Sequence, residues 1–478
     1  MPEPTLAQRL GAFAAATRFE TLPPDVVDSV RMRVLDIVGI CVAASTMDTS
    51  RGTAAFAVEQ GGVAQASAVG VAEKLPAPLA ALVNGVLAHS LDYDDTHLPS
   101  VLHPSACVVP AAMAAAQAAG AGGPATIVAV ACGLEVAVRL GMAGYDAKGR
   151  NSTFFDHGQH ATSICGALGA AVAAGLLNGF DAAGLTDVLG VAASLSSGII
   201  EANRTGGTVK RLHCGWAAHA GVSAAQLVRH GFTGPPTVLE GRFGFFEAWL
   251  HGQFDPHAII DDLGTTWSVP SIVFKPYPAN HFTHTAIDAA MALRPKIGDL
   301  GRIESIELGV AAPIVHTIGE PIDVKRVPET GYMAQFSGPY AVAAGLLGGS
   351  GLGLGIDDFS DALAQDPERR ALMAKVSVVA DEQCTELFPE QFPSVLRVRL
   401  AGGEELVEPV LVNRGGPGNP LTFDELSKKF EDNAGRLLPG SSVEAVERLV
   451  AALDTLDTLD PIFNELESLS QLSTQSAS

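Results

Sequence analysis

The sequence predicts a mainly α-helical protein with a smaller α+β domain inserted into the helical one. The chain has 478 residues, which is more than one ordinary hydrophobic core holds. Apolar residues make up 47% of it and charged residues only 17%, so a large interior can be buried. The spacing of the apolar residues changes from helical to alternating near residue 265 and returns to helical near residue 410. We therefore expect a helical domain from residues 1–265 and 409–465, an α+β lid domain at 266–408, and a disordered tail at 466–478.

The first part of the chain carries one predicted helix after another. In residues 23–45, two prolines and an early acid precede apolar residues at helical spacing, as at the start of a helix. Residues 124–145 and 181–202 repeat this pattern. Their many alanines and glycines allow helix axes to approach closely, which favours a compact assembly of helices.

The middle of the chain changes to proline-rich loops and short alternating segments. Residues 302–313 and 395–412 alternate apolar and polar side chains as half-buried strands do, the second around an AGGE turn. Residues 375–381 are a third candidate strand, and one helix is expected at 284–293. Helical spacing then returns in residues 422–438 and 441–456.

The charge balance limits the partners of the protein. The formal net charge is -22, and a chain of that sign repels nucleic-acid phosphates and anionic lipid surfaces. An anionic substrate would therefore need a local cationic pocket. Residues 104–134 and 161–180 carry no charged side chain, but alanine dominates them and glycine interrupts them, so we expect buried helices and no membrane span.

The cysteines and the N-terminus predict a cytoplasmic protein. No C-x-x-C pair occurs, and the six cysteines are scattered through apolar surroundings, as expected of buried thiols in a reducing compartment. The first residues contain an early glutamate and no basic segment before an apolar one, unlike a secretory signal. We expect neither a disulfide framework nor a metal site.

The stretch AHSLDYDDTHLPSVLHPSA, residues 88–106, concentrates proton carriers in a chain that is otherwise poor in charge. If the helix before it continued, His89, Asp92 and Thr96 would lie opposite an apolar stripe, which predicts the polar wall of a cavity. His103 stands just before a proline that is expected to open the next helix. We interpret this cluster as functional.

Two further histidine groups precede predicted helices. His157 and His160 lead into an alanine-rich helix, whose N-terminus favours a neutral imidazole that can accept a proton. Lys210, Arg211 and His213 follow a pair of glycines at the start of another helix, which suits a carboxylate or a phosphate.

A fourth group lies near the start of the predicted α+β domain. The segment FKPYPANHFTH places Lys275, Asn280 and His281 before a helix, close to the expected domain boundary. Binding residues often lie where two domains meet, so this group is a candidate for substrate binding.

Two apparent motifs carry less weight. The glycine-rich GGSGLGLG at 348–355 lacks the strand, the helix and the Lys-Ser/Thr of a phosphate loop, so we expect an ordinary loop. The DYDDT segment at 92–96 is like the aspartate clusters that hold Mg²⁺ for diphosphate chemistry. Mg²⁺ needs further oxygen ligands, and the sequence shows no second acidic cluster near the basic groups, so this remains a remote alternative.

Five segments together resemble one family. They are VNGVLAHSLDYDDTH with HPSA, GQHATSICGALGAAVAAGLL, GGTVKRLHCGWAAHAG, FKPYPANHFTH and RGGPGNPLTFDELSKKFEDNA. In order and style these resemble the MmgE/PrpD family, which includes 2-methylcitrate dehydratase, cis-aconitate decarboxylase and iminodisuccinate epimerase. The resemblance covers roughly residues 10–455.

The resemblance implies a homodimer, chemistry without a cofactor, and a small di- or tricarboxylate substrate. It also implies a set of site residues, to which our reading of the sequence adds His213 and His281. We expect His103, His160, Asp92 and Lys210 to be catalytic, and Thr96, Lys275, Asn280, His281 and His213 to bind substrate. Asn280 stands where some members of the family have histidine, and the segment from Asp92 to His103 differs in length from some members.

The function expected on these grounds is a carbon–oxygen lyase that dehydrates a 2-methylcitrate-like hydroxy acid. His103 would be the general acid and base, Asp92 would orient a neighbouring imidazole, and Lys210 and Lys275 would hold carboxylates. Decarboxylation of cis-aconitate and epimerisation of a dicarboxylate are the near alternatives. A non-catalytic ligand-binding protein and the Mg²⁺-dependent diphosphate enzyme are the remote ones.

Overall fold

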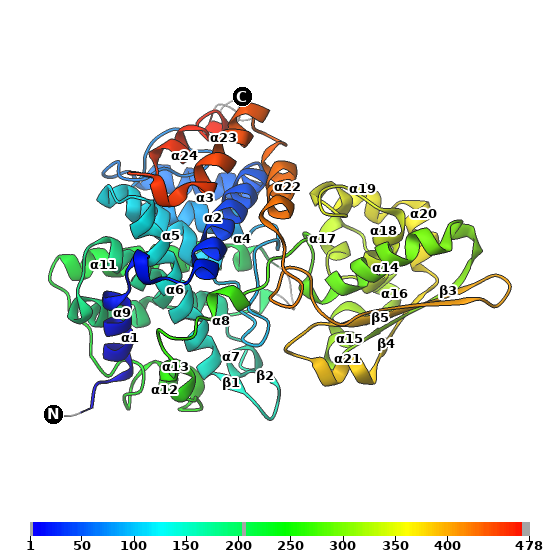
Figure 1. The fold of residues 1–478 in the computed structure, drawn as a ribbon, viewed down its shortest axis with the longest axis horizontal. Coiled ribbons are helices and arrows are strands. Elements are labelled where there is room, and N and C mark those ends of the chain that lie inside the picture. Colours follow the sequence, from blue (N-terminus) through cyan, green and yellow to red (C-terminus); the bar gives the residue numbers. More distant parts are fainter. Residues whose placement is uncertain (1–2, 203–206, 471–478) are drawn as a thin grey trace. The chain divides into compact units, whose positions relative to one another are not determined.

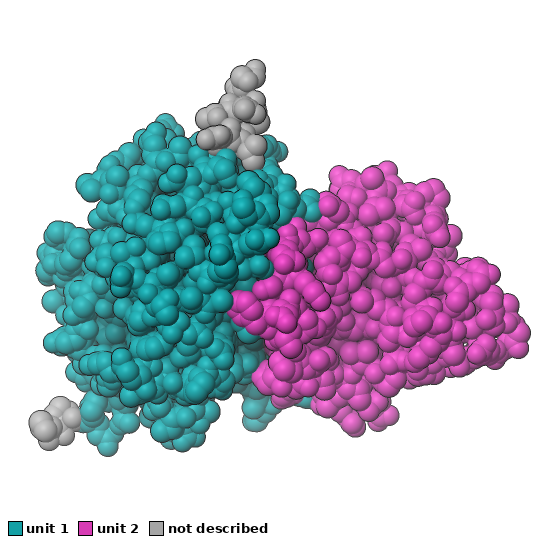
Figure 2. All heavy atoms as spheres, turned by 45° about the horizontal axis from the view of Figure 1, so that its top comes forward, with its two compact units in different colours: residues 1–272, 433–478 teal, residues 273–432 magenta. Residues whose placement is uncertain are grey.

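The computed structural model describes residues 3–202 and 207–470 and separates the chain into two compact units. The first unit comprises residues 1–272 and 433–478, and the second comprises residues 273–432 (Figures 1 and 2). The predicted domain limits were 265/266 and 408/409. The second unit extends further along the chain because helix α22 (Phe423–Ala434) is tied to it: Glu425 accepts a 2.8 Å hydrogen bond from Arg414.

The first unit is helical, as its alanine-rich segments predict. Its only strands in the described ranges are the two-residue pair β1 (Tyr145–Asp146) and β2 (Asn151–Ser152). Three single 3-10 turns complete it (Phe19–Thr21, Val269–Ser271 and Leu453–Thr455). The helices are α1 (Leu6–Ala16), α2 (Pro24–Ala44), α3 (Asp48–Gln60), α4 (Ala77–His89), α5 (Ser105–Ala119), α6 (Gly123–Ala143), α7 (Thr153–Asp156), α8 (Ala161–Leu177), α9 (Ala182–Leu195), α11 (Val209–Arg229), α12 (Phe245–Leu250), α13 (His257–Ile260), α23 (Gly440–Ala451) and α24 (Asp460–Asn464).

Helix α8 forms the centre of this unit. Every residue of α8 except Leu176 is buried, and the helix packs against α5, α6, α9 and α11 (Figure 1). Within the described residues, α6 is the one helix long and apolar enough to span a membrane, and 89% of its apolar window is buried inside the protein. Burial of α5, α6 and α8 agrees with the prediction of core helices for residues 104–134 and 161–180.

Helices α4 and α11 cross where both carry a glycine. A Cβ atom added at Gly85 would lie 2.7 Å from the Cα of Gly215, and one added at Gly215 would lie 2.4 Å from the carbonyl oxygen of Leu82. No larger side chain fits between these backbones without displacing one of them. The crossing therefore holds the end of α4, at His89, close to the first turns of α11.

The opening polar stretch is not a continuous helix, which corrects the helical-wheel prediction. Helix α4 ends at His89, and residues 90–104 form an irregular segment before α5. Asp92 has a φ of 52°, in the left-handed region that a helix cannot continue through. Side chains on this segment consequently point in several directions.

The second unit is α+β, and its strands agree with the alternating segments. Strand order is β4-β3-β5-β6, from β3 (Ile303–Val310), β4 (Val376–Ala380), β5 (Ser394–Leu400) and β6 (Glu405–Val410). Strand β3 pairs parallel with β4, in register Leu308 with Val378, and antiparallel with β5, which in turn pairs antiparallel with β6.

Helices α14 (His284–Ile297) and α18 (Gly338–Leu347) pack against each other and against this sheet (Figure 1). The GGSGLGLG segment is a loop, as predicted: the Asp358 carboxylate accepts backbone hydrogen bonds from Ser350, at 2.9 Å, and Gly355, at 2.8 Å. The shorter helices are α15 (Ala312–Ile318), α16 (Ile322–Lys325), α17 (Gly331–Ala334), α19 (Asp361–Ala364), α20 (Pro367–Met373) and α21 (Glu382–Leu387), with 3-10 turns at His281–Thr283, Leu300–Arg302 and Ile356–Phe359.

The predicted disordered tail begins too early. Leu466 and Leu469 are buried, each about 3% exposed, so the folded chain continues at least to residue 470. The segment is polar on average, so a prediction based on its composition misses these two buried leucines. The remainder of that prediction, residues 471–478, lies outside the described residues.

Candidate active site

Four histidine rings meet inside the first unit, each brought there by a different element. His89 ends α4, His103 precedes α5, His160 precedes α8, and His213 lies in the first turns of α11. The ring centroid of His89 is 5.3 Å from that of His103 and 5.8 Å from that of His160. The ring centroids of His160 and His213 are 4.9 Å apart. One imidazole cluster therefore unites segments more than a hundred residues apart.

The segment before α5 is held in place by Asp95. Its buried carboxylate is paired with the guanidinium of Arg33 and accepts a hydrogen bond from the hydroxyl of Ser105. Arg33, on α2, also donates to the carbonyl oxygens of Val269, at 3.0 Å, and Ile272, at 2.8 Å. A buried charge needs such partners, and together they anchor the residues that precede His103.

The ring of His103 is oriented by backbone and hydroxyl groups. Its Nδ1 lies 2.7 Å from the carbonyl oxygen of Asp95 and 3.2 Å from the hydroxyl of Thr96. Its backbone N–H donates to the Thr162 hydroxyl at 3.1 Å. A carbonyl only accepts, so Nδ1 carries the proton, and Nε2 is the basic nitrogen of the neutral ring. Thr96 lies beside His103, where it supports this orientation.

His160 and His213 contact each other through like atoms. Their Nδ1 atoms are 2.9 Å apart, so one donates the hydrogen and the other accepts it. Burial and then repulsion from His89 hold the pKa of His160 well below its ordinary value. The same two causes, in the same order, lower the pKa of His213 to about 4. The pair is therefore neutral near pH 7.

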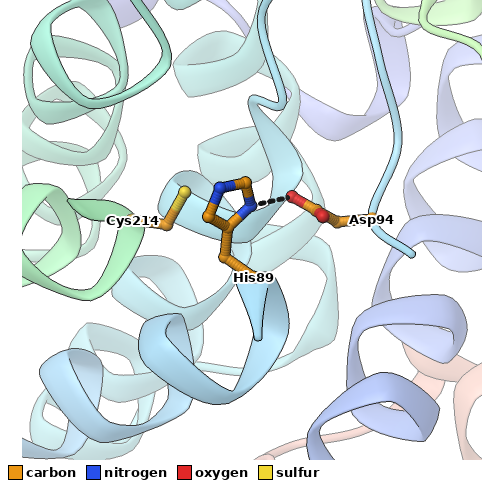
Figure 3. A group of neighbouring side chains, drawn as sticks. All are labelled: His89, Asp94 and Cys214. Carbon is orange, nitrogen blue, oxygen red and sulfur yellow. Dashed lines mark hydrogen bonds and ion pairs between the residues drawn. The ribbon is translucent and has the colours of Figure 1, made fainter. Parts of the chain in front are cut away.

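His89 lies between a carboxylate and a thiol (Figure 3). Its Nδ1 is 2.8 Å from the Asp94 carboxylate, and its other ring nitrogen faces the sulfur of Cys214. Burial, the largest single influence, lowers the pKa of His89. The Asp94 charge, the interaction with Cys214 and the hydrogen bonds to these two residues together outweigh burial and raise the pKa to about 10. Burial raises the pKa of the Cys214 thiol well above its ordinary value. At neutral pH this row is a carboxylate, an imidazolium and a thiol.

Among the described residues, one group of histidine, cysteine and acidic side chains could hold a metal ion, and it consists of these same three residues. Their ligand atoms all lie within 4.8 Å of one another. A shared metal ion would need one imidazole nitrogen to point at the same place as the Asp94 oxygen and the Cys214 sulfur. Asp94 instead bonds Nδ1, and Cys214 faces the opposite nitrogen of the ring. The arrangement fits a hydrogen-bonded row better than a shared metal ligand set.

Lys210 supplies a cation from the first turn of α11. Its Nζ lies 3.5 Å from the Asp92 carboxylate, and its side chain is 20% exposed. Asp92 thus contacts an ammonium, and Asp94 contacts the imidazole of His89. The three acids of DYDDT are paired with three different cations, Lys210, His89 and Arg33. They do not form the common set of oxygen ligands that Mg²⁺ requires.

Three predicted binding residues belong to the second unit. Lys275 and His281 are buried, and the His281 ring lies 4.6 Å from that of His284. Asn280 caps a 3-10 turn: its side-chain oxygen accepts the backbone hydrogen of Phe282 at 3.1 Å. This capping contact gives Asn280 a local structural role.

The structure brings together six of the predicted residues in the first unit: His103, His160, His213, Thr96, Asp92 and Lys210. It also adds Asp94 and Cys214, and it adds His89, which sequence analysis placed in the functional cluster of residues 88–106 but gave no catalytic or binding role. The density of acids and histidines in residues 88–106 indicated that carboxylates would be functional. Their pairing could not be read from spacing, because a non-helical segment carries them.

A helical unit built from both ends of the chain, with an imidazole and carboxylate cluster inside it, defines a protein equipped for proton transfer. The chain belongs to the MmgE/PrpD family: residues 8–257 match the MmgE/PrpD N-terminal domain and residues 277–455 match the MmgE/PrpD C-terminal domain.

Several characterised proteins are similar to the chain. The cis-aconitate decarboxylase of Homo sapiens is 29% identical over 399 residues, which cover 80% of this chain and 77% of that protein. The cis-aconitate decarboxylase of Aspergillus terreus is 25% identical over 473 residues, 95% of this chain and 94% of that protein. A mitochondrial 2-methylcitrate dehydratase of Yarrowia lipolytica is 26% identical over 255 residues, 50% of this chain and 46% of that protein.

Proposed function

We propose that the protein is a lyase that acts on a small di- or tricarboxylate through histidine acid–base chemistry. One observation carries this proposal: four imidazoles lie in one cluster, and their surroundings raise the pKa of His89 but lower the pKa of His160 and of His213. Titratable groups whose surroundings push their pKa values apart are typical of acid–base sites.

Lys210 is the proposed anchor for a substrate carboxylate. Its side chain is 20% exposed, and its ammonium lies 3.5 Å from the Asp92 carboxylate, which is longer than a tight charge-assisted hydrogen bond. A substrate carboxylate can compete for that ammonium. This local cation also offsets the repulsion between an anionic substrate and a chain of net charge -22.

His103 is the proposed general acid and base. With Nδ1 bound to the Asp95 carbonyl, Nε2 takes or gives the proton. In decarboxylation the bond to the leaving carboxylate breaks as CO₂, its electron pair stays on carbon, and protonated His103 donates the hydrogen of the new C–H bond. In dehydration His103 removes a proton from carbon, the electron pair forms the double bond, and the hydroxyl leaves as water after protonation by a second acid.

Decarboxylation of a cis-aconitate-like acid is our first candidate. Relatives named cis-aconitate decarboxylase align over most of this chain. Dehydration of a 2-methylcitrate-like acid, which sequence analysis favours, is the second, supported by the dehydratase that aligns over half of the chain. Epimerisation of a dicarboxylate uses the same groups and is the third.

A product screen tests these candidates. Citrate, 2-methylcitrate, cis-aconitate and smaller hydroxy diacids would be incubated with the protein, with and without EDTA, and analysed by mass spectrometry. Release of CO₂ marks a decarboxylase, loss of water a dehydratase, and inversion without a change in mass an epimerase. Stabilisation by these acids without turnover would instead indicate a binding protein, and loss of activity in EDTA would favour the Mg²⁺ alternative.

We further propose a cytoplasmic homodimer. All six cysteines are buried thiols, which suits a reducing compartment. Light scattering coupled to size-exclusion chromatography would measure the oligomeric state, and cell fractionation would measure the location.

A further inference from the structure

The side chain of His89 occupies the middle of the imidazole cluster without belonging to the proposed proton-transfer groups. It is 3% exposed, and its ring lies within 5.3 Å of His103 and 5.8 Å of His160, measured between centroids. Its Nδ1 is bonded to the fully buried carboxylate of Asp94 at 2.8 Å (Figure 3). A group so placed affects its neighbours mainly through its charge.

We propose that His89 is a positioning residue whose buried ion pair with Asp94 keeps the His160–His213 pair neutral, an inference that rests on the proposed acid–base function. The two Nδ1 atoms at 2.9 Å share one hydrogen. In a neutral pair, the ring that donates through Nδ1 has a basic Nε2, and the ring that accepts carries its hydrogen on Nε2. The pair thus holds one proton acceptor and one proton donor at the same pH.

Protonation of either ring would destroy this complementarity. An added proton gives that ring hydrogens on both nitrogens, so the pair keeps donors and loses its basic nitrogen. A positive charge already fixed at His89 opposes such protonation, because like charges at this distance in a buried site repel strongly. Asp94 is needed to keep His89 charged, since burial alone favours the neutral ring.

The groups around His89 come from several elements, and their charges are consistent with this role. Cys41 of α2 faces Asp94, and burial raises the pKa of that thiol, so it stays uncharged. The Cys214 thiol, on α11, stays uncharged for the same reason. Lys210, also on α11, adds a second positive charge that lowers the pKa of His160 and of His213. The titratable groups facing the His89 ring are Asp94, His103, His160, His213, Cys214 and Lys210.

Cys214 is not a reactive nucleophile in this arrangement. A thiolate beside the Asp94 carboxylate would place two negative charges around one imidazolium in a buried site. The high pKa of the Cys214 thiol agrees with that cost. The row of Asp94, His89 and Cys214 is therefore an electrostatic device.

The test follows histidine protonation directly in the full-length protein. Isotope-labelled histidine side chains would be titrated by NMR from about pH 8 down to about pH 3. His160→Gln and His213→Gln variants would assign the two signals through their loss. In the unmodified protein we expect the His213 midpoint near pH 4 and the His160 midpoint well below the ordinary value for histidine.

Asp94→Asn keeps the size of the side chain and removes its charge, and His89→Gln removes the imidazolium itself. In both variants we expect the His160 and His213 midpoints to move up toward the ordinary value of about 6.5. The acid limb of kcat against pH should move to higher pH by the same amount. A merely structural role for His89 would leave both readouts in place.

A control separates the charge of His89 from the loss of a buried histidine in general. His97→Gln removes a different buried histidine. It should not shift the two midpoints. Unchanged midpoints in Asp94→Asn and His89→Gln proteins that still melt cooperatively would overturn the inference. Because NMR needs no substrate, absence of turnover would count against the proposed function alone.

Discussion

The ammonium of Lys210 lies 3.5 Å from the carboxylate of Asp92, although 118 positions separate them in the sequence. Asp92 follows α4 and Lys210 begins α11, and the glycine crossing of these helices brings the two segments together. The contact joins two motifs that are separate in the sequence, the acid-rich stretch and the basic helix start. It also identifies Asp92 as an acid that forms an ion pair with Lys210, the proposed anion-binding residue.

Replacing Lys210 should impair substrate use. We expect Lys210→Met to lower kcat/KM by about 10- to 100-fold, because a hydrogen bond to a charged group contributes about 1.5–3 kcal/mol. Steady-state kinetics with the substrate identified by the product screen measures this. Lys74 offers a matched control, since it forms an exposed ion pair with Asp460 at 3.0 Å in the same unit. Lys74→Met should leave kinetics unchanged, and equal losses in the two variants would remove the anion-anchor role.

Removing the imidazole of His103 should abolish most of the turnover. Loss of a general acid or base typically reduces rates by about 10² to 10⁴, and we expect His103→Gln to fall in that range. Thr96→Val should cost less, because the Asp95 carbonyl still orients Nδ1. Single-turnover rates and circular-dichroism melts would be measured together. A His103→Gln protein that retains full kcat would exclude His103 from proton transfer.

The α4–α11 crossing should tolerate no side chain. Gly215→Ala places a Cβ 2.4 Å from a backbone oxygen, and overpacking of this kind costs about 1–3 kcal/mol of the free energy of unfolding. Gly52→Ala is the control, because it lies in helix α3 with nothing within 4 Å of the added atom. It should be neutral or stabilising by about 0.5–1 kcal/mol. Urea unfolding measures both, and equal effects would contradict a close crossing.

Acid should destabilise the protein through its buried neutral histidines. Burial and then the charge of Arg33 lower the pKa of His97 from the ordinary 6.5 to about 4 in the folded state. As pH falls below 6.5, the unfolded chain binds the proton first, so stability declines down to about pH 4. At about 1.4 kcal/mol per pKa unit, His97 alone accounts for at most about 3 kcal/mol.

The His97→Gln variant isolates that contribution. Its free energy of unfolding, measured by urea at a series of pH values, should decline less over this window than that of the unmodified protein. His257 is exposed, so His257→Gln should keep the full decline. If both variants lose stability in parallel with the unmodified protein, His97 does not titrate as described.

The sequence by itself determined the fold class, the strands and the residue types that make up the candidate site. Helical and alternating apolar spacing marked several of the long helices and all four strands of the sheet, because burial of one face imposes its period on the residues. Composition also marked the site, since histidines and acids stand out in residues 88–106 of a chain with 17% charged residues. The spacing of apolar residues and the local composition are properties of short stretches of sequence, so they can be read without the tertiary structure.

Only the tertiary structure decided which of these groups interact. Asp94 contacts His89 while Asp92 contacts Lys210, and no spacing rule distinguishes them once the helix ends at His89. The pairing of His160 with His213 depends on how α8 and α11 pack. Protonation states follow from burial and from charges brought close by folding, and both are properties of the packed molecule.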